Sequence, residues 1–227
     1  MNSNKICFIT CVNKPRLYDE ALLYISELEI PDGFTVDVIA ITDAISMASG
    51  YNKAMRQSDA MYKIYLHQDV FIRNKNFLKD VLAVFHNAPK LGIVGVIGAK
   101  KLPDNGVWWD SDSLFGQVVE NHLGPMKLLK FNEPETSFES IEALDGLIMA
   151  TQSDINWRDD LFDGFHFYDS SQCKEFITAG FGVGILKQED PWVMHDCGNK
   201  RNWQGEYEKY RQIFVNEYLS KDTSIVK

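Results

Sequence analysis

A histidine and an aspartate, His67 and Asp69, stand two positions apart directly after an apolar segment. The preceding residues 61–66 read MYKIYL, a pattern typical of a β-strand. Side chains two positions apart on an extended backbone point to the same side. We therefore expect the imidazole and the carboxylate to emerge together at the carboxyl end of a strand, where open α/β sheets bind ligands. A solvated, polar strand end is the alternative that the spacing alone leaves open.

The first hundred residues alternate short apolar segments with segments of helical spacing. The expected strands are residues 6–12, 35–42, 62–66 and 91–99, and the expected helices are residues 17–28, 47–58 and 77–85. Ser46 is placed to cap the second of these helices. The order β-α-β-α-β-α-β predicts a parallel sheet with helices on both sides.

The second half of the chain is less regular. Residues 100–140 indicate loops and short strands, and residues 141–151 indicate a strand interrupted at Asp145 and Gly146. A helix capped by Asp169 or Ser170 should run to about residue 179 and stop at Gly180. The last expected elements are a strand over 181–186 and a helix carrying Trp203, Tyr207, Tyr210 and Phe214. One domain over residues 1–227 is the simplest interpretation.

The composition narrows the class of protein. The 227 residues carry a formal net charge of −9, and 45% of them are hydrophobic, as in ordinary soluble globular proteins. The negative charge disfavours nucleic acid as a partner, because nonspecific binding needs clustered lysine and arginine. The four cysteines form no CxxC pair, so we expect free thiols and a cytoplasmic location. No segment reaches the roughly 18 apolar residues of a transmembrane helix.

Two segments together resemble a known enzyme family. Residues 6–13, ICFITCVN, resemble the opening strand of family-2 glycosyltransferases, which ends in an asparagine. Residues 46–69 resemble the family's next block, a helix with an asparagine followed by a strand that ends in an Asp-x-Asp motif. Asn52 takes the asparagine position here, and His67-Gln68-Asp69 takes the position of the acidic motif.

Further segments resemble one subgroup, the glycosyltransferase-like proteins related to a streptomycin-biosynthesis protein. The matching segments are LHQDVFI, GIVGVIGA followed by VWW, LDGL at 144–147, WRDD at 157–160, FHFYD at 165–169, Trp192, and HDCG at 195–198. The resemblance implies a GT-A fold, an α/β fold with a mixed, mostly parallel and Rossmann-like sheet flanked by helices. Residues 1–100 would then bind a nucleotide sugar, and residues 101–227 an acceptor.

The resemblance also implies a divalent metal, Mn²⁺ or Mg²⁺, which neutralises the diphosphate as the sugar leaves. By position, Asp69 is the expected ligand, and His195 is a second candidate whose alternative is a hydrogen-bonded loop histidine. His67 replaces the first acid of the motif, and three roles stay open: ribose contact, metal contact or neither. The implied donor is a UDP-, GDP- or dTDP-sugar, and the implied acceptor is a hydroxyl of a glycan or a small molecule.

In family-2 enzymes the catalytic base is an aspartate of an acidic pair at the start of a helix. Here Tyr168 takes the place of the first acid, and Asp169 is the candidate base. Asp169 and Gln172 also fit a capping box, so a purely structural role is the alternative. His166 is a second candidate, because an imidazole accepts a proton near neutral pH.

The remaining predicted contacts concern the donor. Thr10, Asn13 and Asp43 follow the first two strands, where the resemblance places the nucleotide base and ribose; for Asp43 a turn residue is the alternative. Asp145 matches a segment near the donor sugar. Trp108, Trp109 and Trp157 are candidates for stacking on a sugar ring, with core packing as the alternative.

Three functions follow from these residues. The first is a metal-dependent, inverting glycosyltransferase, and the second is a glycosyltransferase-like protein that binds a nucleotide or carbohydrate without turnover. The third is a nucleotidyltransferase, which favours a glycine-rich, basic loop after the first strand. Residues 11–15, CVNKP, contain no glycine, so this function ranks lowest.

Overall fold

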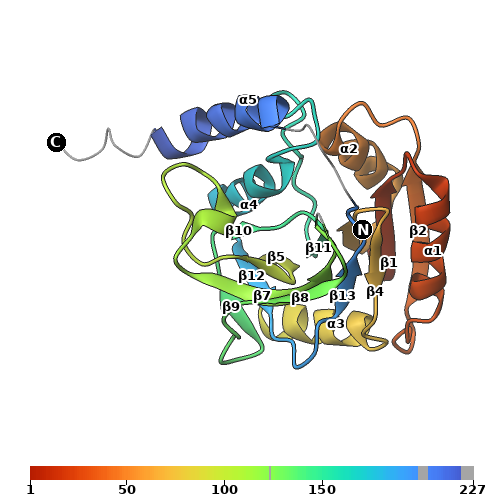
Figure 1. Cartoon of the computed structure of the whole chain (residues 1–227). Helices are drawn as coiled ribbons and strands as arrows, with labels where there is room; N and C mark the ends of the chain where they lie inside the picture. The colour runs from red at the N-terminus through yellow and green to blue at the C-terminus, as the bar shows by residue number, and fades with distance from the viewer. Residues whose placement is uncertain (123, 199–203, 221–227) are drawn as a thin grey trace.

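The computed structural model describes residues 1–122, 124–198 and 204–220. Its larger sheet has seven strands in the order β2-β1-β3-β11-β5-β12-β9 (Figure 1). Their bounds are β1 Asn2–Cys11, β2 Thr35–Ile41, β3 Ala60–Leu66, β5 Leu91–Gly95, β9 Phe138–Ser140, β11 Ile148–Thr151 and β12 Gly182–Leu186. Most strands run in one direction, whereas β11 and β9 are reversed. The sheet is therefore mixed, and the predicted alternation over the first hundred residues is confirmed.

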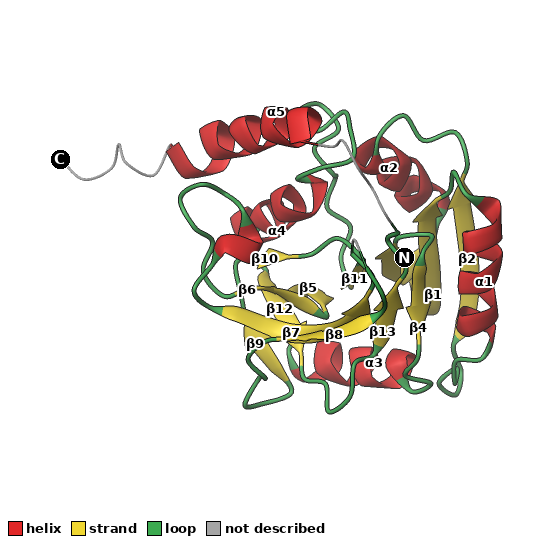
Figure 2. Cartoon of the chain, in the orientation of Figure 1, coloured by secondary structure: helices red, strands yellow, loops and turns green. Residues whose placement is uncertain are grey.

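A second, smaller sheet packs beside the first, in the order β10-β6-β7-β13-β4, with β8 paired to β7. Its strands are β4 Val70–Ile72, β6 Ile97–Ala99, β7 Leu114–Glu120, β8 Lys127–Lys130, β10 Ala143–Leu144 and β13 Val193–His195. Figure 2 shows these strands in front of the larger sheet, with the helices around both. Two strands of this sheet, β4 and β13, come to lie at the functional site.

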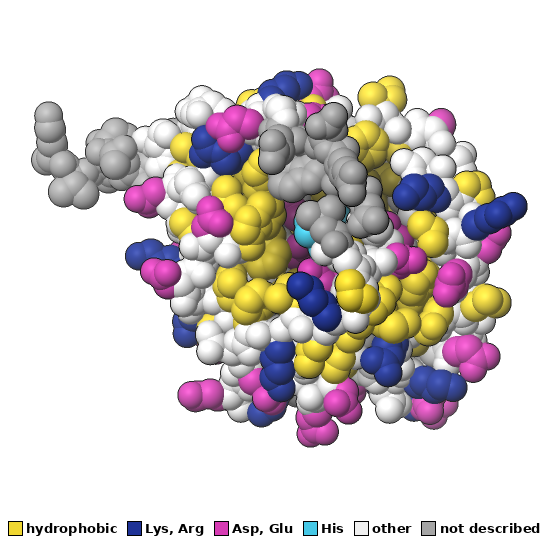
Figure 3. Space-filling model, viewed as in Figure 1, with side chains coloured by type: hydrophobic (Ala, Val, Ile, Leu, Met, Phe, Trp, Pro, Cys, Tyr) yellow, Lys and Arg dark blue, Asp and Glu magenta, His cyan; other side chains and the backbone are white. Residues whose placement is uncertain are grey.

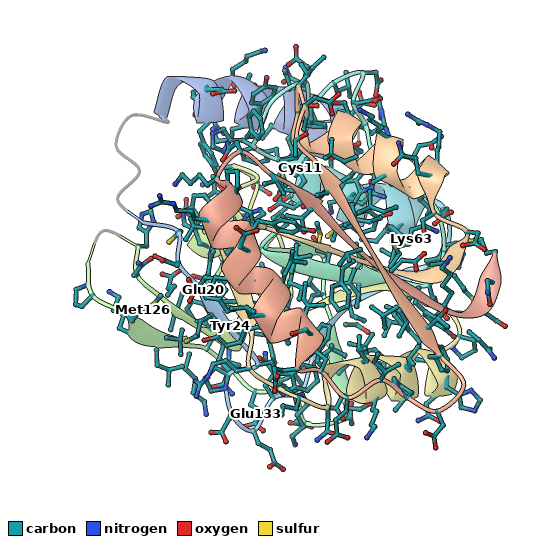
Figure 4. The ribbon with its side chains drawn as sticks, turned by 90° about the vertical axis from the view of Figure 1, so that its right-hand side faces the viewer. Cys11, Glu20, Tyr24, Lys63, Met126 and Glu133 are labelled. Carbon is teal, nitrogen blue, oxygen red and sulfur yellow. The ribbon has the colours of Figure 1, made fainter. Side chains whose placement is uncertain are left out.

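Helices cover both faces of the larger sheet. They are α1 Pro15–Ser26, α2 Met47–Gln57, α3 Phe77–Asn87, α4 Tyr168–Thr178 and α5 Gln204–Phe214, with short helical turns at Trp108–Asp110 and Val215–Leu219. In β1, Ile6 and Phe8 join the hydrophobic cluster that contains residues of α3, whereas Cys7 and Ile9 join the cluster of α2 and α4. Figure 4 shows α1, with Tyr24 and Glu20, lying across the strands.

Two predicted boundaries are confirmed, and one is wrong. Ser46 caps α2 in a capping box with Ser49, and Gly180 ends α4 with a φ of +84°. Residues 91–99 are not one strand, because Val96 separates β5 from β6 and these strands belong to different sheets. Gly98 packs so closely on Ala143 that a Cβ would lie 2.1 Å from its carbonyl oxygen. The continuous apolar segment thus reflects burial in two sheets.

No helix of the described residues is both long enough and apolar enough to cross a bilayer. Trp203, predicted to lie in the last helix, is outside the described residues.

The larger sheet contains a fully buried lysine, which yields a stability prediction. The ammonium of Lys63 lies 2.8 Å from Asp154 Oδ1 and 2.5 Å from the carbonyl oxygen of Ala60. We expect Asp154→Ala to lower the free energy of unfolding by about 2 to 3 kcal/mol, because the ammonium stays buried without its counter-charge. Urea denaturation measures this change, and adding Lys63→Met should restore most of the loss. A loss below about 0.5 kcal/mol for Asp154→Ala would contradict the assignment.

Candidate functional site

His67, Gln68 and Asp69 form a turn between β3 and β4. The amide of Val70 donates to the carbonyl oxygen of His67 over 3.2 Å, so the backbone is not the extended strand end that the sequence predicts. Asp69 is buried, and His67 is half-buried. The imidazole and the carboxylate still converge, but a turn and a neighbouring strand bring them together rather than strand alternation.

The neighbouring strand is β13, which ends in His195. It pairs antiparallel with β4, with His195 opposite Val70, and the amide of Asp196 donates to the backbone oxygen of Asp69 over 2.8 Å. His195 Nε2 lies 3.4 Å from Asp69 Oδ1 and 3.4 Å from His67 Nδ1. Three predicted residues that are up to 128 positions apart in the chain therefore meet at one point. Figure 3 shows histidine and acidic side chains close together near the middle of the face in view.

β11 brings a second carboxylate to the same point. It runs antiparallel between β3 and β5, with Ile148 opposite Leu66, and the His67 amide donates to the carbonyl oxygen of Leu147 over 3.0 Å. The residues just before β11 therefore lie beside the end of β3. Asp145 is one of them, and it accepts a 2.9 Å hydrogen bond from the amide of Leu147.

α4 begins at the same place, but neither predicted cap begins it. The capping position belongs to Phe167, whose φ of 59° is in the left-handed region. That conformation costs about 1 to 2 kcal/mol for a residue with a side chain. The ring of Phe167 is buried against Tyr207 and Phe214, with centroids 4.9 Å and 5.4 Å away, and this packing holds the backbone in place. Tertiary contacts thus set the start of the helix.

Asp169 faces the loop before β11. Its Oδ2 accepts from the amide of Gly146 over 2.9 Å, and its Oδ1 accepts from the amide of Ser170 over 2.7 Å. The predicted capping box with Gln172 is wrong, because Gln172 donates to the carbonyl oxygen of Ile155 instead. Asp169 therefore ties the start of α4 to the loop that carries Asp145.

Tyr168 contacts the histidine of the turn. Its hydroxyl oxygen lies 2.5 Å from His67 Nε2 and 3.3 Å from the carbonyl oxygen of Gly146. A Cβ on residue 146 would lie 2.2 Å from that hydroxyl oxygen, so the approach requires glycine. The two positions where the chain departs from the acidic motifs of family-2 enzymes, His67 and Tyr168, are thus hydrogen-bonded to each other.

The two contacts of the Tyr168 hydroxyl favour one tautomer of His67. Burial raises the pKa of Tyr168 well above its ordinary value, so the hydroxyl group stays protonated and has one hydrogen to donate. A carbonyl oxygen only accepts, so both contacts are satisfied when Tyr168 donates to Gly146 and accepts from Nε2–H of His67. We assign this tautomer from the hydrogen-bond network. Nδ1 then carries a lone pair directed toward His195, as metal ligation requires.

The three side chains fit a divalent transition metal. Donor atoms about 2.1 Å from one ion, at right or tetrahedral angles, lie about 3.0 to 3.4 Å apart. His195 Nε2 is 3.4 Å from its two neighbours, and the donor atoms of His67, Asp69 and His195 all lie within 4.8 Å of one another. Two imidazoles favour Mn²⁺ over Mg²⁺, which prefers oxygen.

The charge around these residues also favours a cation. No lysine or arginine of the described residues pairs with Asp145, Asp169 or Glu120. Burial, and secondly the charge of Asp145, raises the pKa of Asp169 to about 7. Burial also raises the pKa of Asp145. Carboxyl groups with raised pKa values are typical of functional sites.

Two cavities meet at His67. The strand-end cavity, about 130 Å³, lies over the ends of β1 and β3 and includes Asn13, Gln68 and Asp69 in its lining. The aromatic cavity, about 230 Å³, is lined by Trp108, Trp109, Phe165, His166, Tyr207, Asp145, Asp169 and His195, among others. His67 and Phe165 line both cavities. A larger hollow around Arg73 and Trp192 shares no lining residue with either of them.

The predicted donor contacts occupy different surroundings. Asn13 lines the strand-end cavity, whereas Asp43 is exposed and pairs with Lys53. Thr10 is buried within β1. Asn52 is buried and brackets Trp157, donating to its carbonyl oxygen over 2.8 Å and accepting from its amide over 2.9 Å. Trp157 itself packs among buried tyrosines. Asn52 and Trp157 thus hold the core beneath the site, and their donor contacts stay predictions.

Two residues of the site were not predicted. Gln68 accepts from the amides of Asn13 and Lys14 over 2.9 Å and 2.7 Å, and it fixes the loop after β1 to the turn. Tyr207 forms a wall of the aromatic cavity, with ring centroids 5.4 Å from Trp109 and 5.4 Å from His166. Gln68 lies between His67 and Asp69, so the motif itself indicates that Gln68 belongs to the site. Nothing near Tyr207 in the sequence indicates its role.

Solved structures share this arrangement of strands and helices. The mannosyltransferase PcManGT from Pyrobaculum calidifontis, in complex with GDP-Man and Mn²⁺, has a TM-score of 0.54 and 13% identity, over 91% of this chain and 60% of that chain. Residues 1–349 of TarS from S. aureus have a TM-score of 0.52 and 11% identity, over 85% of this chain and 60% of that chain. The same TarS fragment in complex with UDP-GlcNAc gives a TM-score of 0.52 at 10% identity, over 90% of this chain and 61% of that chain.

The predicted fold class is confirmed: the chain has the mixed α/β fold of GT-A glycosyltransferases. It spans about three-fifths of the length of these neighbours. The profile of the glycosyltransferase-like family matches residues 7–218, and the chain belongs to that family. Comparison with curated proteins gave no match.

The contact between Tyr168 and His67 yields a metal-binding prediction. We expect Tyr168→Phe to weaken Mn²⁺ binding by about tenfold, because His67 loses the partner that fixes its tautomer and ring orientation. Isothermal titration calorimetry with MnCl₂ measures the change. Tyr51→Phe is the matched control, since Tyr51 packs in the same aromatic cluster with its ring 5.9 Å from Tyr168. Equal affinities for wild type and Tyr168→Phe would contradict the assigned role.

Proposed function

We propose that the protein is a metal-dependent, inverting glycosyltransferase that moves a sugar from a nucleoside-diphosphate donor to a hydroxyl acceptor. The observation that carries the proposal is the convergence of His67, Asp69 and His195 at the boundary of two cavities, with Asp169 in one of them. Family membership supports glycosyl transfer. The proposal includes membership of the subgroup related to a streptomycin-biosynthesis protein. It also includes a cytoplasmic location, which the four free thiols support.

The donor occupies the strand-end cavity in this proposal, and residues 1–100 supply most of its contacts. Asn13, positioned by Gln68, lines that cavity together with Asp69. The solved neighbours support a nucleotide sugar as the donor, since one holds GDP-Man with Mn²⁺ and another holds UDP-GlcNAc. UDP-sugars and GDP-sugars are therefore the first donors to test, and dTDP-sugars follow them.

Asp69, His67 and His195 would hold the metal. When bound, the ion neutralises the charge that develops on the departing diphosphate. Each side chain is already oriented by its neighbours. Asp69 is buried, and its backbone oxygen accepts a hydrogen bond from the amide of Asp196. Tyr168 contacts the ring of His67, and the pairing of β13 with β4 positions His195. Such preorganisation reduces the entropy lost when the site assembles around its ligands.

Asp169 would take the acceptor proton. It lines the aromatic cavity, where the acceptor hydroxyl is expected, and its two backbone hydrogen bonds fix the carboxyl group. A pKa of about 7 suits a base that works near neutral pH. The proton moves from the acceptor hydroxyl to a carboxylate oxygen as the acceptor oxygen attacks the sugar carbon opposite the leaving diphosphate. His166, in the same cavity, is the second candidate base.

The metal-ligand assignment predicts a loss of donor binding. We expect Asp69→Asn to reduce Mn²⁺-dependent binding of UDP- or GDP-sugars at least tenfold, because a neutral amide is a poor ligand for a hard cation. Thermal shift assays with UDP-, GDP- and dTDP-sugars, each with and without Mn²⁺, measure the binding. Asp159→Asn, at an exposed position, is the control. Donor binding by Asp69→Asn that equals wild type would remove Asp69 from the site.

The base assignment predicts a pH profile. Because burial raises the pKa of Asp169 above its ordinary value, the folded state favours the protonated form, and the fraction of active carboxylate grows as the pH rises. We expect kcat/KM for transfer to rise toward a plateau with a midpoint at or below pH 7, since a bound cation lowers the pKa. Asp169→Asn should lose transfer by about 100-fold or more.

Donor affinity measured for Asp169→Asn separates a role of Asp169 as the base from a role in donor binding. A base that only accepts the acceptor proton leaves donor binding within about twofold of wild type. Transfer that persists in Asp169→Asn with an unchanged pH profile would exclude Asp169 as the base and turn attention to His166→Ala.

A second candidate, a protein that binds the nucleotide sugar without turnover, is favoured by one observation. The hydrogen bond between His67 and Tyr168 occupies the two positions where family-2 enzymes carry acids. Donor binding without transfer to any hydroxyl acceptor in a glycan panel, and without donor hydrolysis, would support this function.

A further inference from the structure

A second group of metal-binding side chains shares His195 with the site described above. Glu120, His195 and Cys197 offer ligand atoms that all lie within 4.8 Å of one another. The strand register explains the arrangement: β13 runs parallel to β7 with His195 opposite Glu120, and Cys197 follows two residues later. Two strand ends thus supply a carboxylate, an imidazole and a thiol.

Each member of this group has surroundings that suit a ligand. Glu120 is half-buried at the end of β7, and no hydrogen bond or ion pair engages its carboxylate among the described residues. Cys197 is buried, with 8% of its surface exposed, and makes one long contact of 3.5 Å to Asn121 Oδ1. Burial and the charge of Glu120 raise the pKa of the Cys197 thiol. A half-buried carboxylate beside a thiol, with no counter-charge among residues 1–122, 124–198 and 204–220, is a costly arrangement that a cation would relieve.

The donor types identify the cation. A thiolate is a poor ligand for Mg²⁺ and Mn²⁺, whereas a thiolate together with an imidazole and a carboxylate is a typical ligand set for Zn²⁺. Three protein ligands leave the fourth tetrahedral position open to water. The His67–Asp69–His195 group contains no sulfur, so of these two groups only Glu120–His195–Cys197 can form a thiolate bond to its metal.

We propose that Glu120, His195 and Cys197 form a zinc-binding site that competes with the His67–Asp69 pair for the shared imidazole. On binding, Zn²⁺ replaces the thiol proton, which passes to solvent. Zinc at this site takes His195 away from Asp69 and His67, so zinc acts as an inhibitor of the proposed transferase. The inhibition rests on the proposed function, whereas the zinc site itself does not.

Cobalt reports directly on the thiolate. Co²⁺ is a spectroscopic substitute for Zn²⁺, and a cysteine thiolate bound to it gives a charge-transfer absorption in the near ultraviolet that nitrogen and oxygen ligands do not give. We expect titration of the wild-type protein with CoCl₂ to produce this absorption. Cys197→Ser should abolish it, and Cys11→Ser, the matched control at a thiol outside the group, should keep it. Absence of the absorption in wild type, or its persistence in Cys197→Ser, would overturn the proposal.

Calorimetry with ZnCl₂ and MnCl₂ separates the two sites. We expect Cys197→Ser and Glu120→Gln to weaken Zn²⁺ binding at least tenfold while Mn²⁺ binding stays within twofold of wild type. Circular dichroism confirms that each variant is folded. Glu120→Gln keeps the shape of the side chain, so it still tests the site if Cys197→Ser fails to fold. Unchanged Zn²⁺ affinity in both variants contradicts the zinc site. Unchanged Mn²⁺ affinity in Asp69→Asn contradicts the proposed function alone.

Discussion

The hydrogen bond between the Tyr168 hydroxyl and His67 Nε2, 2.5 Å long, is the interaction on which the geometry of the site depends. It joins the two positions where family-2 enzymes carry acids. Two carboxylates at this distance would repel each other, and one would stay protonated. An imidazole and a phenol instead share a hydrogen bond without this repulsion, and His67 Nδ1 lies 3.4 Å from His195 Nε2. The departures from the family motif therefore compensate each other, and the site keeps an imidazole nitrogen as a donor atom where it loses an acid.

Backbone pairing in two sheets brings this interaction together with its neighbours. Ile148 opposite Leu66 sets Asp145 and Gly146 beside the turn, and Val70 opposite His195 sets the second imidazole against Asp69. A slip of one residue in either pairing would turn these side chains to the other face of the sheet. Among the described residues, no lysine or arginine pairs with the carboxylates of Asp145 and Asp169 that are gathered in this way. A cation bound there, as proposed, would supply the charge balance, and the raised pKa of Asp169 leaves one carboxyl able to exchange a proton near neutral pH.

The sequence predicts most of the first half of the fold, because its strands are short apolar segments and its helices carry apolar residues at helical spacing. It does not predict the break at Val96, since both β5 and β6 are apolar and only the pairing partners differ. It also misses the start of α4 at Phe167, which depends on packing against Tyr207 and Phe214. The resemblance indicated His67, Asp69, Asp145, Asp169 and His195, and the structure brings them together. The bond between Tyr168 and His67 joins residues 101 positions apart, and no local pattern encodes it.

We infer that His67, oriented by Tyr168, binds a metal together with Asp69 and His195. Crystals grown with Mn²⁺ and a nucleoside diphosphate, with diffraction data collected at a wavelength where manganese scatters anomalously, test it most directly. We expect an anomalous peak about 2.0 to 2.3 Å from His67 Nδ1, from His195 Nε2 and from an Asp69 carboxylate oxygen. A peak bound by Asp69 without His67, or no peak between the three side chains, would contradict it.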